Sequence, residues 1–379
     1  MQKRYLLAPG PTPVPPEVLL SMALPIIHHR SPDFLPVLDS AKKGLQWLFQ
    51  TKNDVLILSC SGTGAMVGAV NNFFNPGDKV LVINGGKFGE RWTKICQAYG
   101  LKAEEIVVEW GYSARPEAVE KALRQDPDIK GVFVQATETS TGVYHDIEGL
   151  GKAISKFPNT LFIVDAISAL VAQDLRTDEW GVDVMIGGSQ KGLMLPPGLA
   201  FAGASEKAWK RNETSKMPRF YFNFKKEREN LAKNQTNFTS PITLIIGLNE
   251  AIKILQAEGL KNVFIRHARL AHATREAVKA LGLGIYSKES PSNSVTAVEM
   301  PEGIDGQLVY KTLREKYGIT GAGGQDRAKG KIFRMAHLGY ADTFDVITGI
   351  AALEMVLKGL GHNLKLGSGV AVAQELLMK

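Results

Sequence analysis

The stretch "IGGSQKGLM", residues 186–194, places Lys191 among glycines and a serine directly after an apolar run. A lysine is ordinarily a hydrated charge on a flexible stem, so one at the end of an apolar strand needs an explanation. Small neighbours allow a flat group to approach the backbone closely. Taken alone, Lys191 is also compatible with a surface charge, and only its combination with other motifs favours a functional lysine.

Seven short apolar runs, partly β-branched, alternate with helix-like segments in the first part of the chain. Stretches such as "GAMVGAVNNFF" and "RPEAVEKALRQ" separate the runs. This alternation predicts an α/β fold with a mainly parallel, seven-stranded sheet flanked by helices. The predicted strands cover residues 54–60, 79–85, 102–108, 131–137, 160–166, 182–189 and 198–204.

The sequence also predicts a division into domains. Residues 1–20 are rich in proline and glycine, which predicts an extended N-terminal arm with neither a helix nor sheet pairing. Residues 21–257 would form a large domain, and residues 258–379 a smaller C-terminal α/β domain. The later part of the chain carries predicted helices at 240–260, 263–281, 304–317 and 343–359, and shorter strands at 294–300 and 331–339.

Composition narrows the classes of partner. The chain has 379 residues and a formal charge of +7, which favours anionic small molecules, but no basic stripe interleaved with aromatics predicts nucleic-acid binding. Cys60 and Cys96 are the only cysteines and stand outside any metal-ligand spacing, so we expect neither a disulfide nor a metal site. No apolar run reaches membrane-spanning length, and a cytoplasmic protein is expected.

The run "LSCSGTGAMVGAV" follows a strand and opens a helix, so it predicts a phosphate site. The backbone N–H groups of Ser61, Gly62, Thr63 and Gly64 would be unpaired donors at the positive end of the helix dipole. A dinucleotide-binding turn is less well supported, because Asn84 and Gly85 stand where a ribose-binding acid would be expected. A purely structural turn remains open.

"FIVDAISAL" places Asp165 at the carboxyl end of an apolar strand, where open α/β sheets form ligand crevices. The alternative is an aspartate that caps the next helix. A phosphate site, a strand-end aspartate and a desolvated lysine together match pyridoxal 5'-phosphate, which forms a Schiff base with a lysine amine. The aspartate would keep the pyridine nitrogen protonated, and desolvation would lower the pKa of Lys191.

These motifs resemble the class V aminotransferases of fold type I, in particular the alanine–glyoxylate, serine–glyoxylate and serine–pyruvate aminotransferases. The chain is also similar to cyanobacterial members labelled as a small subunit of a soluble hydrogenase. The resemblance covers nearly the whole chain and rests on "APGPTPVP", "SGTGA", "NGGKFGERW", "ETSTGV", "VDAISAL", "GSQKGLMLPPG" and "IFRMAHLG".

The resemblance implies roles for individual residues. Lys191 would carry the cofactor, Asp165 would pair with the pyridine nitrogen, and Arg334 would bind the substrate carboxylate, with Gly10 nearby and Arg30 as a further candidate. The same resemblance assigns the other cofactor contacts: Ser61, Gly62, Thr63 and Gln190 to the phosphate, Phe88 and Ile167 to the two ring faces, and Ser140 to the region of the ring hydroxyl. In a homodimer with the active site at the subunit interface, Thr239 would reach the partner's phosphate, whereas Thr236 stands where some relatives carry tyrosine.

The expected activity is a ping-pong transamination between alanine or serine and glyoxylate or pyruvate. Two alternatives stay open. The chain could be a non-enzymatic partner subunit of a hydrogenase-type redox complex, as the label of the similar cyanobacterial proteins suggests. A cysteine desulfurase is the other alternative, although both cysteines lie early in the chain and Phe88 holds the stacking position where that enzyme usually has histidine.

Overall fold

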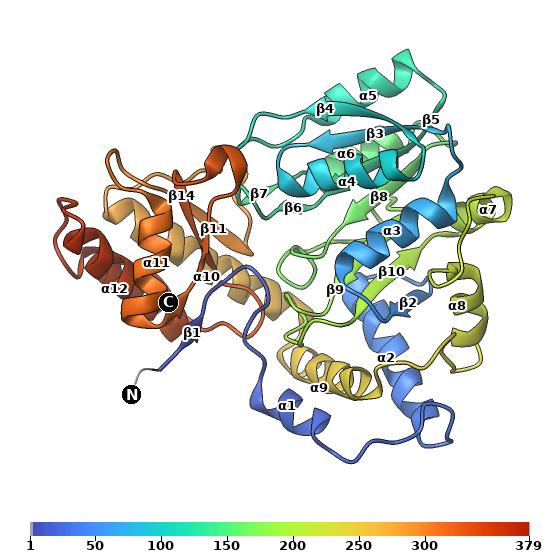
Figure 1. The fold of residues 1–379 in the computed structure, drawn as a ribbon, viewed down its shortest axis with the longest axis horizontal. Helices are drawn as coiled ribbons and strands as arrows, with labels where there is room; N and C mark the ends of the chain where they lie inside the picture. The colour runs from blue at the N-terminus through green and yellow to red at the C-terminus, as the bar shows by residue number, and fades with distance from the viewer. Residues whose placement is uncertain (1–2, 379) are drawn as a thin grey trace.

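The computed structural model describes residues 3–378 and is built around one seven-stranded sheet (Figure 1). Within this sheet β10 runs antiparallel to both of its neighbours, β2 and β9. The other neighbouring pairs are parallel. The predicted mainly parallel sheet is therefore confirmed. The strands, in spatial order, are β2 (Val55–Leu58), β10 (Ala200–Ala204), β9 (Val184–Gly188), β8 (Leu161–Asp165), β5 (Ile129–Gln135), β3 (Lys79–Asn84) and β4 (Lys102–Val107).

The burial of each strand follows from its place in the sheet. Every residue of β2, β8, β9 and β10 is buried, which explains their uninterrupted apolar sequences. The edge strand β4 instead exposes Glu104 and Glu105. Charged side chains on an edge oppose pairing with another sheet.

Helices surround this sheet (Figure 1). Their apolar positions recur at helical spacing, as in α5, where the buried Val119 and Leu123 lie four residues apart. The helices of this part are α2 (Phe34–Phe49), α3 (Gly62–Phe73), α4 (Lys87–Ala98), α5 (Pro116–Gln125), α6 (Ile147–Ile154), α7 (Glu206–Thr214), α8 (Phe224–Leu231) and α9 (Ile242–Glu258), and a short hairpin joins β6 (Thr137–Glu138) to β7 (Val143–Tyr144).

The C-terminal part forms a separate, smaller layer of strands and helices (Figure 1). Its three-stranded antiparallel sheet has the order β11 (Val295–Glu299), β14 (Ile332–Ala336) and β13 (Ala322–Gly323). The predicted strands at 294–300 and 331–339 are confirmed as β11 and β14. The other elements are α10 (Leu260–Ala280), α11 (Gly306–Tyr317), β12 (Ile319–Thr320), a 3-10 turn η1 (Asp326–Ala328), α12 (Thr343–Gly359) and α13 (Ser368–Leu377).

The apolar core consists of two main clusters. Helix α10 contributes to both, because Val263 packs in the first cluster and Leu270 in the second. The predicted division, between residues 257 and 258, falls at the last residue of α9, just before the start of α10. The domain boundaries themselves remain a proposal.

The prediction for residues 1–20 is wrong on secondary structure. Strand β1 (Tyr5–Leu6) pairs in parallel with β12, and helix α1 (Pro16–Met22) begins inside the predicted arm. Proline at the first helical position needs no N–H partner and has a helical φ, so Pro16 starts a helix instead of preventing one. Leu7 is buried in the second apolar cluster, which explains why the chain is held there.

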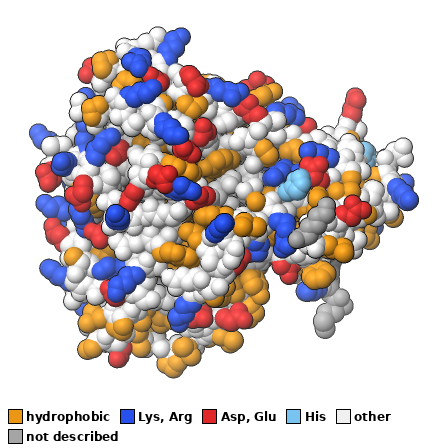
Figure 2. All heavy atoms as spheres, turned by 180° about the vertical axis from the view of Figure 1, so that it is seen from behind, with side chains coloured by type: hydrophobic (Ala, Val, Ile, Leu, Met, Phe, Trp, Pro, Cys, Tyr) orange, Lys and Arg blue, Asp and Glu red, His pale blue; other side chains and the backbone are white. Residues whose placement is uncertain are grey.

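Two further observations concern residues 3–378. None of their helices combines the length and the hydropathy that crossing a bilayer requires. On the face drawn in Figure 2, basic and acidic side chains are interspersed over the surface.

Candidate active site

A pocket of about 470 Å³ lies at the carboxyl ends of β8 and β9, where the N-terminal turns of α3 and α4 also arrive. This is the edge at which parallel sheets place their ligands. Its walls bring together most of the residues predicted from the sequence. The lining residues are Ser61, Gly62, Thr63, Phe88, Arg91, Thr137, Thr139, Asp165, Ile167, Ser168, Gln190 and Lys191.

Lys191 lies in the turn after β9 and is only 9% exposed. Its Nζ donates a hydrogen bond to the backbone carbonyl oxygen of Pro9, and the Thr12 hydroxyl donates to the Lys191 carbonyl oxygen at 3.0 Å. Burial lowers the pKa of Lys191 to about 8, against an opposing effect of Asp165. Lys191 is therefore not the surface charge that its type alone suggests.

Gly10 supplies the space that the Lys191 side chain fills. A Cβ atom at Gly10 would lie 2.4 Å from both Cε and Nζ of Lys191. Gly10 also has a φ of +112°, a conformation that residues with a side chain rarely adopt. The backbone conformation therefore favours glycine here, and a side chain at this position would displace the end of Lys191.

Asp165 is the last residue of β8 and is 5% exposed. Its Oδ1 accepts a hydrogen bond from the backbone N–H of Ile167 at 2.8 Å, so it does bond to the turn that follows the strand. Burial raises the pKa of Asp165 to about 6, and the nearby Glu138 carboxylate adds to this effect. The carboxylate is thus desolvated in the pocket and within electrostatic range of Lys191.

The N-terminus of α3 forms one end of the pocket. Ser61 is the N-cap residue, but its side chain makes no capping hydrogen bond. The N–H groups of a first helical turn have no acceptor within the helix, so an anion can take their place. At Gly62 the Ile167 side chain fills the space that a Cβ atom would need, since that atom would lie 2.3 Å from Ile167 Cδ1.

Ser140 does not line this pocket. Its hydroxyl donates to the carboxylate of the buried Glu138 and accepts a hydrogen bond from the backbone N–H of Lys87 at 3.1 Å. Thr139 takes the place on the pocket wall, where its hydroxyl donates to the Ser168 hydroxyl at 2.7 Å. The backbone turn therefore places Thr139, and not Ser140, on the pocket wall.

Glu138 joins this turn to the start of α4. Its carboxylate accepts hydrogen bonds from the backbone N–H groups of Phe88 and Gly89, both at 3.1 Å. Burial raises the pKa of Glu138, and these hydrogen bonds oppose the rise. A carboxylate at a helix N-terminus is favoured by the helix dipole, so Glu138 fixes the position of Phe88 in the pocket.

Arg334 comes from the middle of β14 in the C-terminal part and is 5% exposed. Its Nε and Nη2 donate to the carbonyl oxygen of Gly323 at 3.1 and 2.9 Å, and Nη1 donates to the carbonyl oxygen of Thr139 at 2.9 Å. Burial lowers the pKa of Arg334 to about 10. Three of its five N–H groups are used in this way, which leaves two for a ligand.

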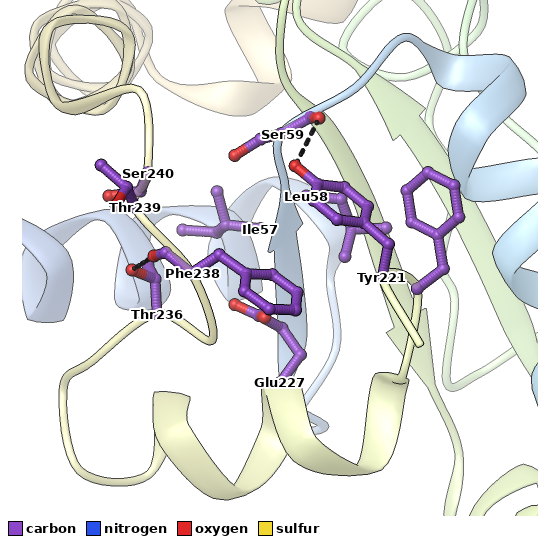
Figure 3. Close-up of a pocket in the computed structure, with 10 residues that line it drawn as sticks. Ile57, Leu58, Ser59, Tyr221, Glu227, Thr236, Phe238, Thr239 and Ser240 are labelled. Atoms are coloured by element: carbon purple, nitrogen blue, oxygen red, sulfur yellow. Dashed lines mark hydrogen bonds between the residues drawn. The ribbon is translucent and has the colours of Figure 1, made fainter. Parts of the chain in front are cut away.

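Gly10 and Arg334 are not lining residues themselves, but they adjoin the pocket through Lys191 and Thr139. Three further predicted residues, Thr239, Thr236 and Arg30, lie away from it. Thr239 and Thr236 line a second cavity next to Tyr221 and Phe238, where the Thr236 hydroxyl donates to the Phe238 carbonyl oxygen (Figure 3). Arg30 is exposed, and its Nη1 donates to Gln235 Oε1 at 3.1 Å. The structure does not bring these residues together with Lys191 of the same chain.

Sequence reasoning missed several lining residues, namely Arg91, Thr137, Thr139 and Ser168. A signal existed for Arg91, because it follows Phe88 by three residues on a helix and such residues share a face. It also existed for Ser168, which follows Asp165 by three residues in a turn. Pro9 contributes only a backbone carbonyl, for which its residue type gives no signal.

The family described as "Aminotransferase class-V" matches residues 4–341. The chain is 44% identical to "Soluble hydrogenase, small subunit" of Synechococcus sp. (strain PCC 6716), over 99% of this chain and 98% of that protein. It is 40% identical to the L-aspartate–glyoxylate aminotransferase of Paracoccus denitrificans, with 97% and 94% covered. It is also 40% identical to the serine–glyoxylate aminotransferase of Hyphomicrobium methylovorum, with 99% and 95% covered.

Comparison with solved structures identifies the same group of enzymes. The crystal structure of an alanine–glyoxylate aminotransferase from Nostoc sp. superimposes with a TM-score of 0.91 at 30% identity, covering 94% of this chain and 96% of that one. The match in sequence and in fold extends over nearly the whole chain. The chain therefore belongs to the class V aminotransferases and is a pyridoxal phosphate-dependent aminotransferase.

Proposed function

We propose that this chain transfers the amino group of alanine or serine to glyoxylate or pyruvate, in two half-reactions that use one site in turn. The observation that carries the proposal is the shared pocket of Lys191, Asp165 and the N-terminus of α3. Glyoxylate is the acceptor in the names of the Paracoccus, Hyphomicrobium and Nostoc aminotransferases, which makes it the first acceptor to test.

The pocket residues fit pyridoxal phosphate. Ser61 leaves the N-terminus of α3 uncapped, as a phosphate requires, and Gln190 has a buried Oε1 atom that no described residue bonds. The side-chain amide of Gln190 can turn over and exchange its oxygen and nitrogen, so either atom is available to a ligand. Ser61, Gly62, Thr63 and Gln190 would hold the phosphate, and Phe88 and Ile167 would supply apolar walls for the ring.

When bound, the cofactor supplies an aldehyde that bonds to amines and a ring that withdraws electrons. Lys191 contributes the amine, which burial keeps partly unprotonated near neutral pH. The uncharged Lys191 Nζ would accept the proton from the substrate Cα and would deliver it to the former aldehyde carbon of the cofactor. Asp165, ionised above a pKa of about 6, keeps a proton on the ring nitrogen.

Arg334 would bind the substrate carboxylate through its two remaining N–H groups. Its contacts with Gly323 and Thr139 hold the guanidinium still, so little side-chain entropy is lost on binding. A single carboxylate clamp favours monocarboxylic donors, because a second buried carboxylate would need a cation of its own. Gly10 would border the substrate next to Lys191.

We also propose a cytoplasmic homodimer in which Thr239 reaches the partner's phosphate. The position of Thr239 away from the Lys191 pocket of its own chain, together with the exposed Phe220 and Tyr221 nearby, supports this arrangement. The hydroxyl of Thr236 is already bonded within its own loop, so Thr236 is the weaker candidate. Cross-linking between Thr239→Cys in one chain and Ser61→Cys in the other would test the dimer, and its absence would contradict this arrangement.

The alternatives have less support. A non-enzymatic role in a redox complex would leave the pocket around Lys191 without a purpose, and the hydrogenase label belongs to the Synechococcus relative. For a cysteine desulfurase the thiol must be nucleophilic, but burial raises the pKa of both Cys60 and Cys96 to about 12. Neither cysteine lines the pocket.

A screen of single half-reactions tests the proposal. Each amino acid is added alone to the cofactor-loaded protein, and the loss of the visible absorption of the lysine-bound cofactor is followed with time. Alanine or serine should give the largest rate per unit concentration, and glyoxylate should restore the absorption. A faster response to aspartate than to either would contradict the proposed donor.

A further inference from the structure

The lining residues of the pocket include an arginine, Arg91 of α4, which the assigned roles do not use. Its Nη1 donates a hydrogen bond to the Thr63 hydroxyl at 3.1 Å. Its guanidinium carbon lies 4.7 Å from the centre of the Phe88 ring. Arg91 therefore contacts both the first turn of α3 and the aromatic wall of the pocket.

Arg91 has no carboxylate partner among residues 3–378. Its contacts there are the Thr63 hydroxyl and the Phe88 ring, and a guanidinium carries five N–H donors, so four remain without a protein acceptor. The other cations of α4 are paired, since Lys87 and Lys94 both bond to Glu90. Asp165 acts on Arg91 only at longer range, and no carboxylate forms an ion pair with this half-buried cation, which indicates that an anionic ligand completes this site.

We propose that Arg91 binds the phosphate group of pyridoxal phosphate, an inference that rests on the proposed function. The bond to Thr63 holds the guanidinium at the uncapped end of α3, where the phosphate is expected. Arg334 instead bonds to Thr139 and Gly323, on the wall assigned to the substrate. A guanidinium matches two phosphate oxygens at once, so Arg91 and the N–H groups of α3 would hold the same group.

The charge balance supports this assignment. A helix N-terminus offers the equivalent of about half a positive charge, which is too little for a phosphate that carries up to two negative charges. The Ser61, Gly62 and Thr63 turn adds no cation of its own. Arg91 supplies a full positive charge without a competing carboxylate within ion-pair distance.

The experiment compares two ligands on the cofactor-free protein: pyridoxal 5'-phosphate and 5'-deoxypyridoxal, which keeps the ring and aldehyde but lacks the phosphate. Dissociation constants are read from the absorption of the lysine-bound ligand. Arg91→Gln should weaken the phosphate-bearing ligand about tenfold or more, as loss of a charge-assisted hydrogen bond predicts. The affinity for 5'-deoxypyridoxal should stay within about twofold, because that ligand has nothing for Arg91 to bind.

Two variants serve as controls. Lys94→Gln removes one positive charge from the same helix, at a side chain that is 67% exposed and bonded to Glu90, and should leave both affinities unchanged. Arg91→Lys keeps the charge but loses the planar fork, and should lie between wild type and Arg91→Gln. Thermal unfolding of the cofactor-free variants checks that each one folds.

The outcomes separate this inference from the function on which it rests. If Arg91→Gln weakens both ligands equally, or neither, Arg91 does not recognise the phosphate and the inference is overturned while transamination stands. The same applies if only substrate selectivity changes. If the wild-type protein forms no lysine-bound species with either ligand, the proposed function fails, and the inference fails with it.

Discussion

The Nζ atom of Lys191 donates a hydrogen bond to the backbone carbonyl oxygen of Pro9, although 182 residues separate the two in sequence. The N-terminal segment is anchored on both sides of this contact, because Tyr5 and Leu6 pair with β12 and Thr12 bonds to the Lys191 backbone. The Pro9 carbonyl oxygen can accept this hydrogen bond from the Lys191 amine in both its neutral and its protonated form. The N-terminal segment therefore lies against the Lys191 side chain and is fixed there.

Gly10→Ala tests how closely the N-terminal segment fits Lys191. The new methyl group would lie 2.4 Å from Nζ, so attachment of the cofactor should fall by about tenfold or more. Gly77→Ala is a matched control, since Gly77 also has a positive φ, of +88°, but has nothing within 4 Å of the added atom. Both variants should lose about 1–2 kcal/mol of stability from backbone strain. Equal cofactor affinity in the two would contradict the contact.

The rate of cofactor attachment should depend on pH through Lys191. Burial lowers its pKa to about 8, so the amine is free above that pH and protonated below it. The second-order rate constant for pyridoxal phosphate with the cofactor-free protein should rise about tenfold per pH unit below 8 and level off above it. A rise that continues to the ordinary lysine pKa near 10.4 would show that the amine is not desolvated.

Asp165→Asn removes the charge that we propose pairs with the ring nitrogen, but keeps the size of the side chain. The half-reaction with alanine should slow by about 10²–10³-fold, because the ring nitrogen loses the partner that keeps it protonated. A cofactor methylated on that nitrogen has a permanent positive charge and should restore part of the rate. Asp128→Asn, at an exposed position, should leave the rate unchanged. An equally slow reaction with the methylated cofactor would contradict the assigned role.

Arg334→Lys should affect substrate binding and leave cofactor binding intact. The lysine ammonium group cannot form the bidentate contact of a guanidinium, and it would lose the hydrogen bonds to Gly323 and Thr139. The kcat/KM for alanine should therefore fall by about 10–100-fold. Most of the change should appear in KM. Arg314→Lys, at an exposed site in the same C-terminal part, is the control. Loss of cofactor with an unchanged KM would contradict the assignment.

The sequence predicted the centre of the site because those residues follow strands. Asp165 ends β8, and Lys191 and the Ser61–Thr63 turn follow β9 and β2 within three residues. The carboxyl ends of parallel strands meet at one sheet edge. The direction in which a side chain points within a turn is harder to predict. The motif "ETSTG" contains three consecutive hydroxyl residues, and only the backbone conformation decides that Thr139 faces the pocket while Ser140 bonds to Glu138.

Other features depend on long-range packing, and their local signal in the sequence is weak or absent. The contact of Pro9 uses a backbone carbonyl, and its position depends on the long-range pairing of β1 with β12. Arg91 looks like an ordinary charge on an amphipathic helix, and only the packing of α4 beside α3 turns it into the pocket. Pro16 was misread because proline both prevents a helix interior and favours a helix start.

Covalent attachment at Lys191 is the central claim, and borohydride reduction of the cofactor-loaded protein tests it most directly. Reduction fixes the bound cofactor on its lysine, and peptide mass mapping then identifies the residue. The account predicts the added mass on the peptide that contains Lys191, with Lys191→Ala protein unlabelled and still folded. Label on a different lysine, or an unmodified Lys191 in fully loaded protein, would contradict it.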